Sequence, residues 1–253
     1  MRPLDLIEAT AGPRHPWEKS RASFFKRVLR QALGRSGPVD ILDCGAGDAF
    51  FSSGLHDVIE VRSLTCWDAN YDESTIAKLA TQYPDVTFTR TMPGRRYDLV
   101  LMLDVIEHVE DDASFVANIV ENCVAKDGHV LVSVPAWQAL YSRHDEFLRH
   151  YRRYAPGDCD RVLTGAGLRI VERGGAFHGL VPARAAQLLR ERLESSLRGQ
   201  KESLREPSST WNAGPLLTGV VTSALWFDNA LSHVARRARV NIPGLSYWAL
   251  AQP

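Results

Sequence analysis

The chain has 253 residues, and its 30 lysines and arginines balance 30 aspartates and glutamates, so the formal net charge is zero. Because the chain has no net positive charge to attract the phosphate groups of nucleic acids, we expect no nucleic-acid partner. The apolar fraction of 45% excludes disorder as the main state and suits one elaborated α/β domain.

The first 37 residues precede the strand-rich part of the chain. Met1–Leu6 carries charged residues and no apolar run, so we expect no secretory signal and a cytoplasmic protein. An amphipathic helix is predicted from about Glu18 to Leu33, ending at Gly34. Residues 1–37 therefore read as a helical N-terminal unit.

Residues 38–180 alternate short β-rich runs with helical stretches. The predicted strands are Val39–Cys44, Leu64–Trp67, Val86–Thr89, Tyr97–Leu103, Gly128–Val134 and Leu168–Arg173. Helices are predicted at about Ser74–Gln82 and Ala113–Val124. Strands separated by helices favour βαβ units and a mostly parallel sheet with helices on both faces. Ser246–Ala251, within the final unit 241–253, would be the seventh strand.

Residues 181–240 form a helical insertion between the last two strands. Pro182–Arg198 is a predicted helix ending at Gly199, and Lys201–Gly214 is a polar linker. An apolar stripe at helical spacing follows, consisting of Leu217, Val220, Val221, Ala224, Phe227, Leu231 and Val234. We interpret the stripe first as core packing, and otherwise as a homodimer contact, a cover over a substrate pocket or a membrane-surface helix. Prolines and glycines interrupt the longest uncharged run, so we expect no transmembrane segment.

The most informative motif is the turn after the first strand, Asp43-Cys44-Gly45-Ala46-Gly47. A strand that runs into Gly-x-Gly brings a nucleotide-like ligand close to bare backbone. The third glycine of a dinucleotide-binding turn is replaced by Phe50, and Asp43 would repel a pyrophosphate. A carboxylate there suits a cationic amino group, so the turn favours S-adenosylmethionine over NAD.

Asp68 ends the second predicted strand, 21 residues after Gly47. A carboxylate at that position can accept hydrogen bonds from ribose hydroxyls. Both cofactors carry a ribose, so Asp68 does not choose between them. The alternative is an aspartate that caps a helix or stabilises a turn.

Four motifs, together and in order, carry a family resemblance: Leu42–Gly47, Trp67-Asp68, Tyr97–His108 and Gly128–Pro135. The chain resembles the class I S-adenosylmethionine-dependent methyltransferases, in the group that includes the ubiquinone-biosynthesis O-methyltransferases. The resemblance implies a Rossmann-like sheet of seven strands, the last antiparallel. It also implies a cofactor site made of Asp43, Gly45, Ala46, Gly47, Asp68, Ala69 and Leu103. His108, in the Glu-His pair after the fourth strand, is expected to be structural.

The helix of the N-terminal unit also resembles a segment that covers the cofactor in these relatives, through Trp17 and Arg21. Arg21 would neutralise the cofactor's carboxylate while Asp43 pairs with its ammonium. The alternative is a helix with a solvated basic face.

The acceptor side is predicted between Trp137 and Tyr154, at the carboxyl end of the fifth strand. His144 is the candidate general base, because an imidazole can accept a hydroxyl proton at neutral pH. Tyr151 and Arg152 would hold an anionic acceptor, and Asp145 would orient an imidazole or pair with an arginine. The alternative is an ion-pair network that fixes this loop to the sheet.

These motifs predict methyl transfer by in-line displacement to a small-molecule, lipid-like or peptide acceptor. We favour oxygen as the acceptor atom, and an N- or C-methyltransferase of a natural product or lipid-like substrate is the first alternative. A nicotinamide-dependent oxidoreductase and a catalytically silent cofactor-binding protein are the further alternatives. We expect no metal site, since Asp104 and Glu107 lack a convincing third ligand and the four cysteines are scattered.

Overall fold

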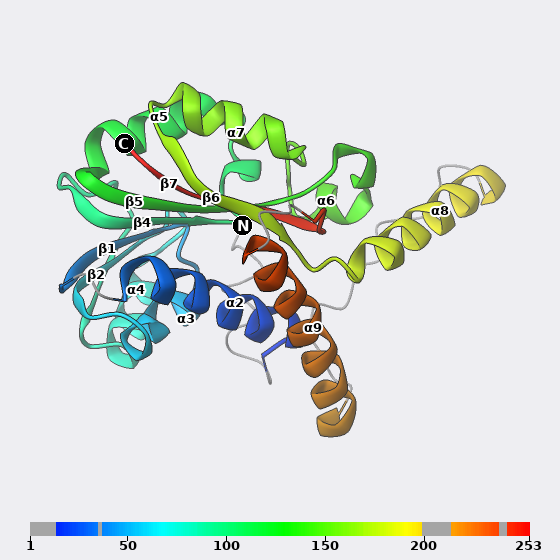
Figure 1. The fold of residues 1–253 in the computed structure, drawn as a ribbon, viewed down its shortest axis with the longest axis horizontal. Coiled ribbons are helices and arrows are strands. Elements are labelled where there is room, and N and C mark those ends of the chain that lie inside the picture. The colour runs from blue at the N-terminus through cyan, green and yellow to red at the C-terminus, as the bar shows by residue number, and fades with distance from the viewer. Residues whose placement is uncertain (1–13, 35–36, 199–213, 238–241) are drawn as a thin grey trace.

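The computed structural model describes residues 14–34, 37–198, 214–237 and 242–253 (Figure 1). The predicted start Met1–Leu6 and the predicted linker, up to residue 213, lie outside the described residues. Among the helices that are described, none combines the length and apolarity needed to cross a membrane.

Seven strands form one sheet in the order β3-β2-β1-β4-β5-β7-β6 (Figure 1). Their bounds are β1 Val39–Cys44, β2 Val61–Trp67, β3 Val86–Thr89, β4 Tyr97–Leu103, β5 Val124–Pro135, β6 Arg169–Ala176 and β7 Ser246–Gln252. Only β7 pairs antiparallel with its neighbours β5 and β6. The predicted seven-stranded, mostly parallel sheet is confirmed, including its antiparallel last strand.

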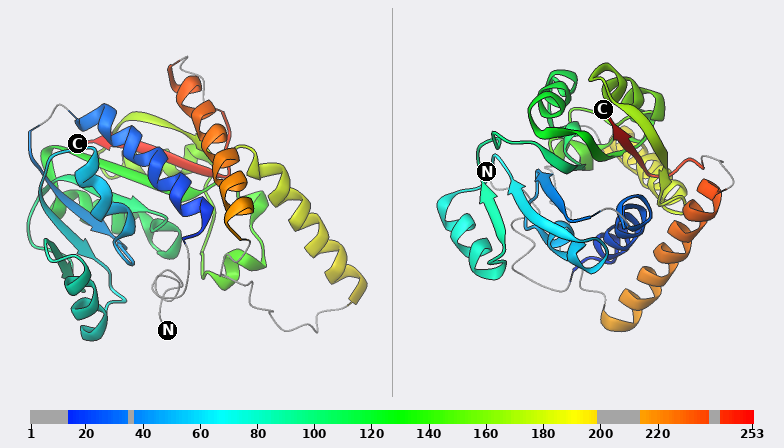
Figure 2. Two further views of the ribbon diagram at one scale, coloured as in Figure 1. Left: turned by 90° about the horizontal axis from the view of Figure 1, so that it is seen from below. Right: turned by 60° about the vertical axis from the view of Figure 1, so that its left-hand side comes forward.

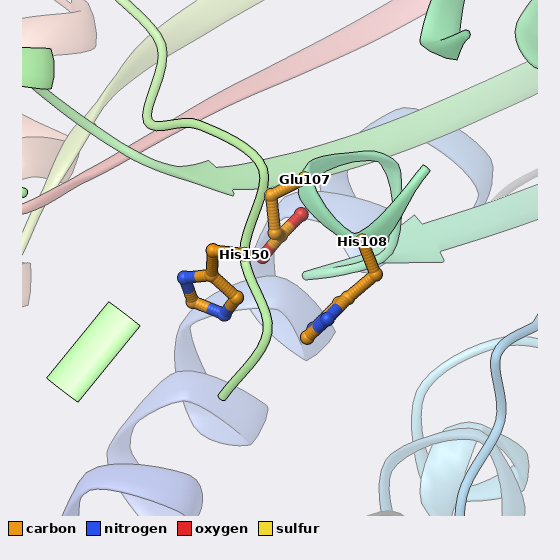
Figure 3. A group of neighbouring side chains, drawn as sticks. All are labelled: Glu107, His108 and His150. Carbon is orange, nitrogen blue, oxygen red and sulfur yellow. The ribbon is translucent and has the colours of Figure 1, made fainter. Parts of the chain in front are cut away.

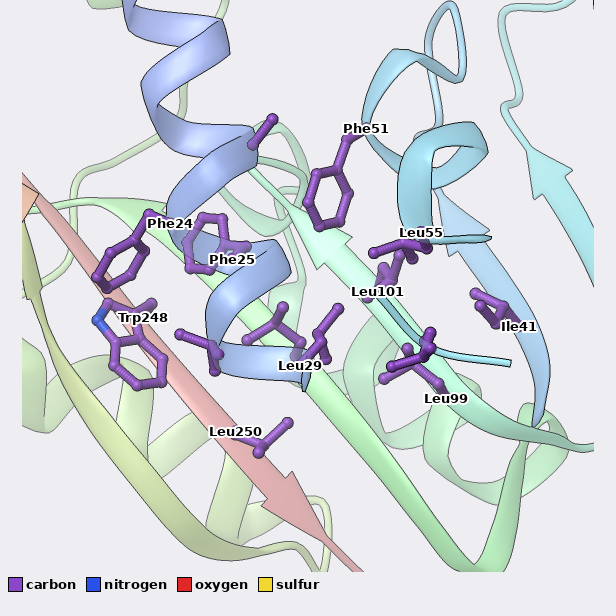
Figure 4. Packing of buried hydrophobic residues seen from close by; sticks show 14 of the residues in the cluster. Phe24, Phe25, Leu29, Ile41, Phe51, Leu55, Leu99, Leu101, Trp248 and Leu250 are labelled. Carbon is purple, nitrogen blue, oxygen red and sulfur yellow. The ribbon is translucent and has the colours of Figure 1, made fainter. Parts of the chain in front are cut away.

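Helices cover both faces of the sheet (Figures 1 and 2). Their bounds are α2 Pro16–Leu33, α3 Phe50–Ser53, α4 Glu73–Gln82, α5 Asp112–Cys123, α6 Arg143–Phe147, α7 Pro156–Gly165, α8 Leu180–Arg198 and α9 Gly214–Arg237. Alternate residues of β1 serve opposite faces: Ile41 packs with α2, and Leu42 packs on the side of α5 and α7. Figure 4 shows the first cluster, in which Phe24 and Phe25 of α2 lie against Trp248.

The helix α7 was not predicted from the sequence. It begins with Pro156 at its first turn, and Asp158 accepts a hydrogen bond from the backbone N–H of Ala155. Proline at the first helical position and an acid at the third are the signals that identify such a start. β5 also begins four residues earlier than predicted, directly after α5.

The predicted core role of the apolar stripe on α9 is wrong for most of its residues, although Val221 is half-buried against the core. Its residues Leu217, Val220, Phe227, Leu231 and Val234 are exposed. The buried face of α9 is partly polar instead: Asn229 donates to Ser20 of α2 and accepts from the Phe177 backbone, and Ser232 bonds His178. These hydrogen bonds and the buried Leu225, which belongs to the core cluster, hold α9 against the rest of the protein, and most of the stripe points outward.

Candidate functional site

The turn between β1 and α3 exposes bare backbone at the carboxyl edge of the sheet. Gly45 and Gly47 have φ of 64° and 54°, in the left-handed region that favours glycine. A Cβ at Gly45 would lie 2.8 Å from Val105 Cγ2, so no larger residue fits without a shift of that side chain. The Gly45 N–H donates to the Trp67 carbonyl at 2.7 Å, which holds the turn against β2.

Three buried carboxylates gather around this turn. Asp43, Asp48 and Asp68 are at most 9% exposed. Asp68 accepts from the backbone N–H of Gly47 at 3.2 Å and from that of Asn70 at 2.8 Å. Asp48 pairs with Arg14. The structure thus brings the predicted Asp43, Gly45, Gly47 and Asp68 together.

Burial, together with the charges of Asp68 and Asp48, raises the pKa of Asp43 to about 7. The Ser52 hydroxyl and the Arg21 guanidinium oppose this without cancelling it. A buried carboxyl with a raised pKa is stabilised in its charged form by a nearby cation. This edge is therefore suited to a ligand with a positive group.

Trp17 and Arg21 lie beside the same edge, on α2. The Arg21 guanidinium stacks 4.5 Å from the centre of the Trp17 ring and forms an ion pair with Asp104. Asp104 follows β4 with φ of 59°, and the Ser133 hydroxyl donates to it at 2.9 Å. Arg21 thus has a protein carboxylate as partner, and its predicted contact with a cofactor carboxylate stays a prediction.

The other predicted cofactor residues lie around the turn. Ala46 and Leu103 are half-buried against the core, and Ala69 is exposed in the turn after Asp68. Their predicted contacts with the cofactor stay predictions.

In the acceptor segment, Asp145 is the centre of a buried ion-pair network. Its carboxylate is fully buried and lies 2.8 Å from Arg153 Nε, 2.9 Å from Arg184 Nη2 of α8 and 3.0 Å from His150 Nδ1. Although burial opposes it, the hydrogen bond of His150 and the charge of Arg153 hold the pKa of Asp145 well below its usual range. Both expected roles of Asp145 are combined, since it orients an imidazole and pairs with arginines.

The predicted catalytic residues of this segment have different surroundings. Burial lowers the pKa of His144, and its backbone N–H donates to the Ser142 hydroxyl at the start of α6. The Tyr151 side chain is 54% exposed. Arg152 pairs with Asp112 at 3.0 Å. Their catalytic roles stay predictions.

Sequence reasoning missed His150, which the fold brings to Glu107 and His108. One potential ligand atom from each lies within 4.8 Å of the other two (Figure 3). Glu107 is fully buried; burial raises the pKa of its carboxyl well above the usual range, and the charge of Asp104 adds to this. The only sequence signal was a second histidine, after His144, in a segment already assigned to the acceptor.

Comparisons with known proteins identify a methyltransferase family. A family model described as a methyltransferase domain matches residues 17–173. A probable S-adenosylmethionine-dependent methyltransferase of Mycolicibacterium smegmatis is 28% identical over 172 residues. That match covers 64% of this chain and 63% of the relative, so the chain spans less than two thirds of the relative's length.

Two solved structures share the fold. The N-methyltransferase NodS from Bradyrhizobium japonicum, in complex with S-adenosylhomocysteine, has a TM-score of 0.50 and 20% identity, over 67% of this chain and 86% of NodS. The [4+2]-cyclase SpnF has a TM-score of 0.55 and 13% identity, over 96% of this chain and 85% of SpnF. At these identities the similarity concerns the fold alone.

Proposed function

The chain belongs to the class I S-adenosylmethionine-dependent methyltransferases, and we propose that it transfers a methyl group from this cofactor to an oxygen of a small-molecule, lipid-like or peptide acceptor. The observation that carries the proposal is the buried Asp43 beside the glycine turn, whose raised pKa marks a site suited to a cation. In this proposal Asp43 pairs with the ammonium of the cofactor. Asp68 accepts its ribose hydroxyls, and the turn at Gly45–Gly47 lets the adenosyl group approach.

The reaction is an in-line displacement. An acceptor oxygen attacks the methyl carbon, the carbon–sulfur bond breaks, and its electron pair stays on sulfur to give a neutral thioether. Because the sulfonium charge disperses, the protein mainly has to align the reactants, which can contribute about 7–11 kcal/mol.

His144 is the proposed general base, since burial keeps its imidazole neutral and able to accept a proton. A positioned base contributes about 10²–10⁴-fold. The variant His144→Ala is therefore expected to lower turnover while cofactor affinity stays intact. Undiminished turnover would leave His144 with a packing role only.

The experiment is a cofactor titration followed by a search for product. Calorimetry with S-adenosylmethionine and with NAD is expected to show binding of the former only. Incubation with labelled cofactor and a host extract should then yield a species that has gained one methyl group by mass. Since a cyclase shares this fold, a protein that binds the cofactor without any methylated product would overturn the proposed reaction.

A further inference from the structure

Glu107, His108 and His150 converge from two segments at the carboxyl edge of β4 (Figure 3). Glu107 and His108 lie in the short turn that follows β4, and His150 lies in the loop after α6. The two imidazole rings meet edge to face, with centres 4.6 Å apart. The Tyr151 N–H donates to the Glu107 carbonyl at 2.8 Å, which fixes the loop to the turn.

Glu107 is the independent sign of a ligand at this point. The residue is fully buried, yet among the described residues neither carboxylate oxygen has a hydrogen-bond partner. A carboxyl group buried without a partner costs several kcal/mol, and protein interiors normally avoid it. A cation held by this carboxylate would satisfy both oxygens.

The histidines are oriented by groups behind them. The Asp145 carboxylate lies 3.0 Å from His150 Nδ1, and we infer that Nδ1 carries the proton and donates to it. The lone pair that can bind a metal is then on Nε2. His108 has a hydrogen bond to the backbone of Arg149. A ring nitrogen bonded to a carboxylate or a carbonyl is the usual support of a histidine that binds a metal.

We propose that Glu107, His108 and His150 bind one divalent first-row transition cation, for which Zn²⁺ and Mn²⁺ are the probes. Two imidazoles and one carboxylate suit such a cation and leave positions open for a substrate. Metal–ligand bonds of about 2.0–2.2 Å keep the ligand atoms of one cation close together, and the three potential ligand atoms here lie within 4.8 Å of one another.

The site deepens the proposed function and rests on it for the role of the cation. The proposed cation would lie near Asp104, at the same edge of the sheet as the glycine turn. An acceptor hydroxyl or carboxylate would therefore occupy one of its open coordination positions. Coordination would lower the pKa of a bound hydroxyl, so that its proton passes more readily to the proposed base His144, and the oxygen then attacks the methyl carbon. This assigns the acceptor to oxygen compounds that can ligate a metal, and it revises the expectation of no metal.

The test measures metal directly. The full chain is treated with chelator, then titrated with ZnCl₂ and with MnCl₂ by calorimetry, and metal content is determined by mass spectrometry. One equivalent is expected for the native chain. Glu107→Gln and His150→Ala should weaken binding at least tenfold, whereas His129→Ala, a half-buried histidine bonded to Gln252, should bind as the native chain does.

Thermal unfolding followed by circular dichroism and S-adenosylmethionine affinity are measured on every variant, so that lost folding is not read as lost metal. No stoichiometric binding, or equal binding by Glu107→Gln and the native chain, would overturn the site. Stoichiometric metal without methyl transfer would leave the site standing and refute the proposed function instead.

Discussion

Asp43 and Asp145 are both buried aspartates at the carboxyl edge of the sheet, yet the pKa of one is raised and that of the other is lowered. Asp145 has two arginines and a histidine within hydrogen-bond distance, whereas the Ser52 hydroxyl and the charge of Arg21 only partly offset burial and the carboxylates Asp68 and Asp48 around Asp43. Burial acts on both, so the difference comes from the partners. A buried charge that already has its partners holds a structure together, and one that lacks them is available to a ligand.

The largest effect is expected where the charge is already paired. Asp145→Asn leaves Arg153 and Arg184 buried without their partner, so unfolding free energy should fall by about 3–5 kcal/mol. Urea denaturation measures this. Removing the exposed arginine of the Arg161–Asp158 pair, in Arg161→Ala, should change stability by less than about 1 kcal/mol. Equal losses of unfolding free energy in Asp145→Asn and Arg161→Ala would contradict the greater importance of the buried, paired charge.

A smaller effect is expected at the ligand side. Asp68→Ala should weaken S-adenosylmethionine binding by more than about tenfold, or about 1.4 kcal/mol, because ribose hydroxyls lose their acceptor. Calorimetric titration checks it, and Asp57→Ala, an exposed carboxylate paired with Lys26, is the control. Unchanged affinity would show that Asp68 only stabilises its turn.

The pH dependence of cofactor binding should sharpen the comparison further. Since the pKa of Asp43 is about 7 in the empty protein, the carboxyl takes up a proton as pH falls through that value, and a bound ammonium must displace it. Affinity should therefore decline below pH 7, by at most about tenfold per unit. Calorimetry in buffers of different ionisation enthalpy counts the released proton. Asp43→Asn should flatten the profile; a slope that persists in this variant would point to another group.

A further effect concerns the empty protein at high pH. Since the pKa of Asp43 is raised from its ordinary value of 3.8 to about 7, the fold loses stability as pH rises through this range, and the full loss is present above pH 7. Asp43→Asn should therefore unfold at a higher temperature than the native chain at pH 8. The difference should shrink at pH 5, where the native carboxyl is protonated. A lower unfolding temperature for this variant at pH 8 would indicate that Asp43 is already satisfied.

Local patterns predicted the sheet and the grouping of Asp43, Gly45, Gly47 and Asp68 at its edge. For the acceptor segment they offered an ion-pair network as an alternative, but they did not show that His150 meets Glu107 and His108. β1, β3 and β4 were predicted to the residue, because apolar runs bounded by glycines, aspartates and other turn residues identify strands. His150 reaches Glu107 only because Arg149 adopts a φ of 61° and turns the chain back after α6. Contacts between segments about forty residues apart leave no periodicity in the sequence.

Arg184 adds a mechanical consequence. It belongs to α8, the first helix of the insertion, and its guanidinium reaches Asp145 across the acceptor loop. If α8 swung outward to admit a bulky molecule, Asp145 would lose one cation and its grip on the His150 ring would loosen. The position of α8 and the orientation of the His150 ring are therefore coupled through Asp145. A bound molecule that leaves α8 in place would leave the orientation of this ring unchanged.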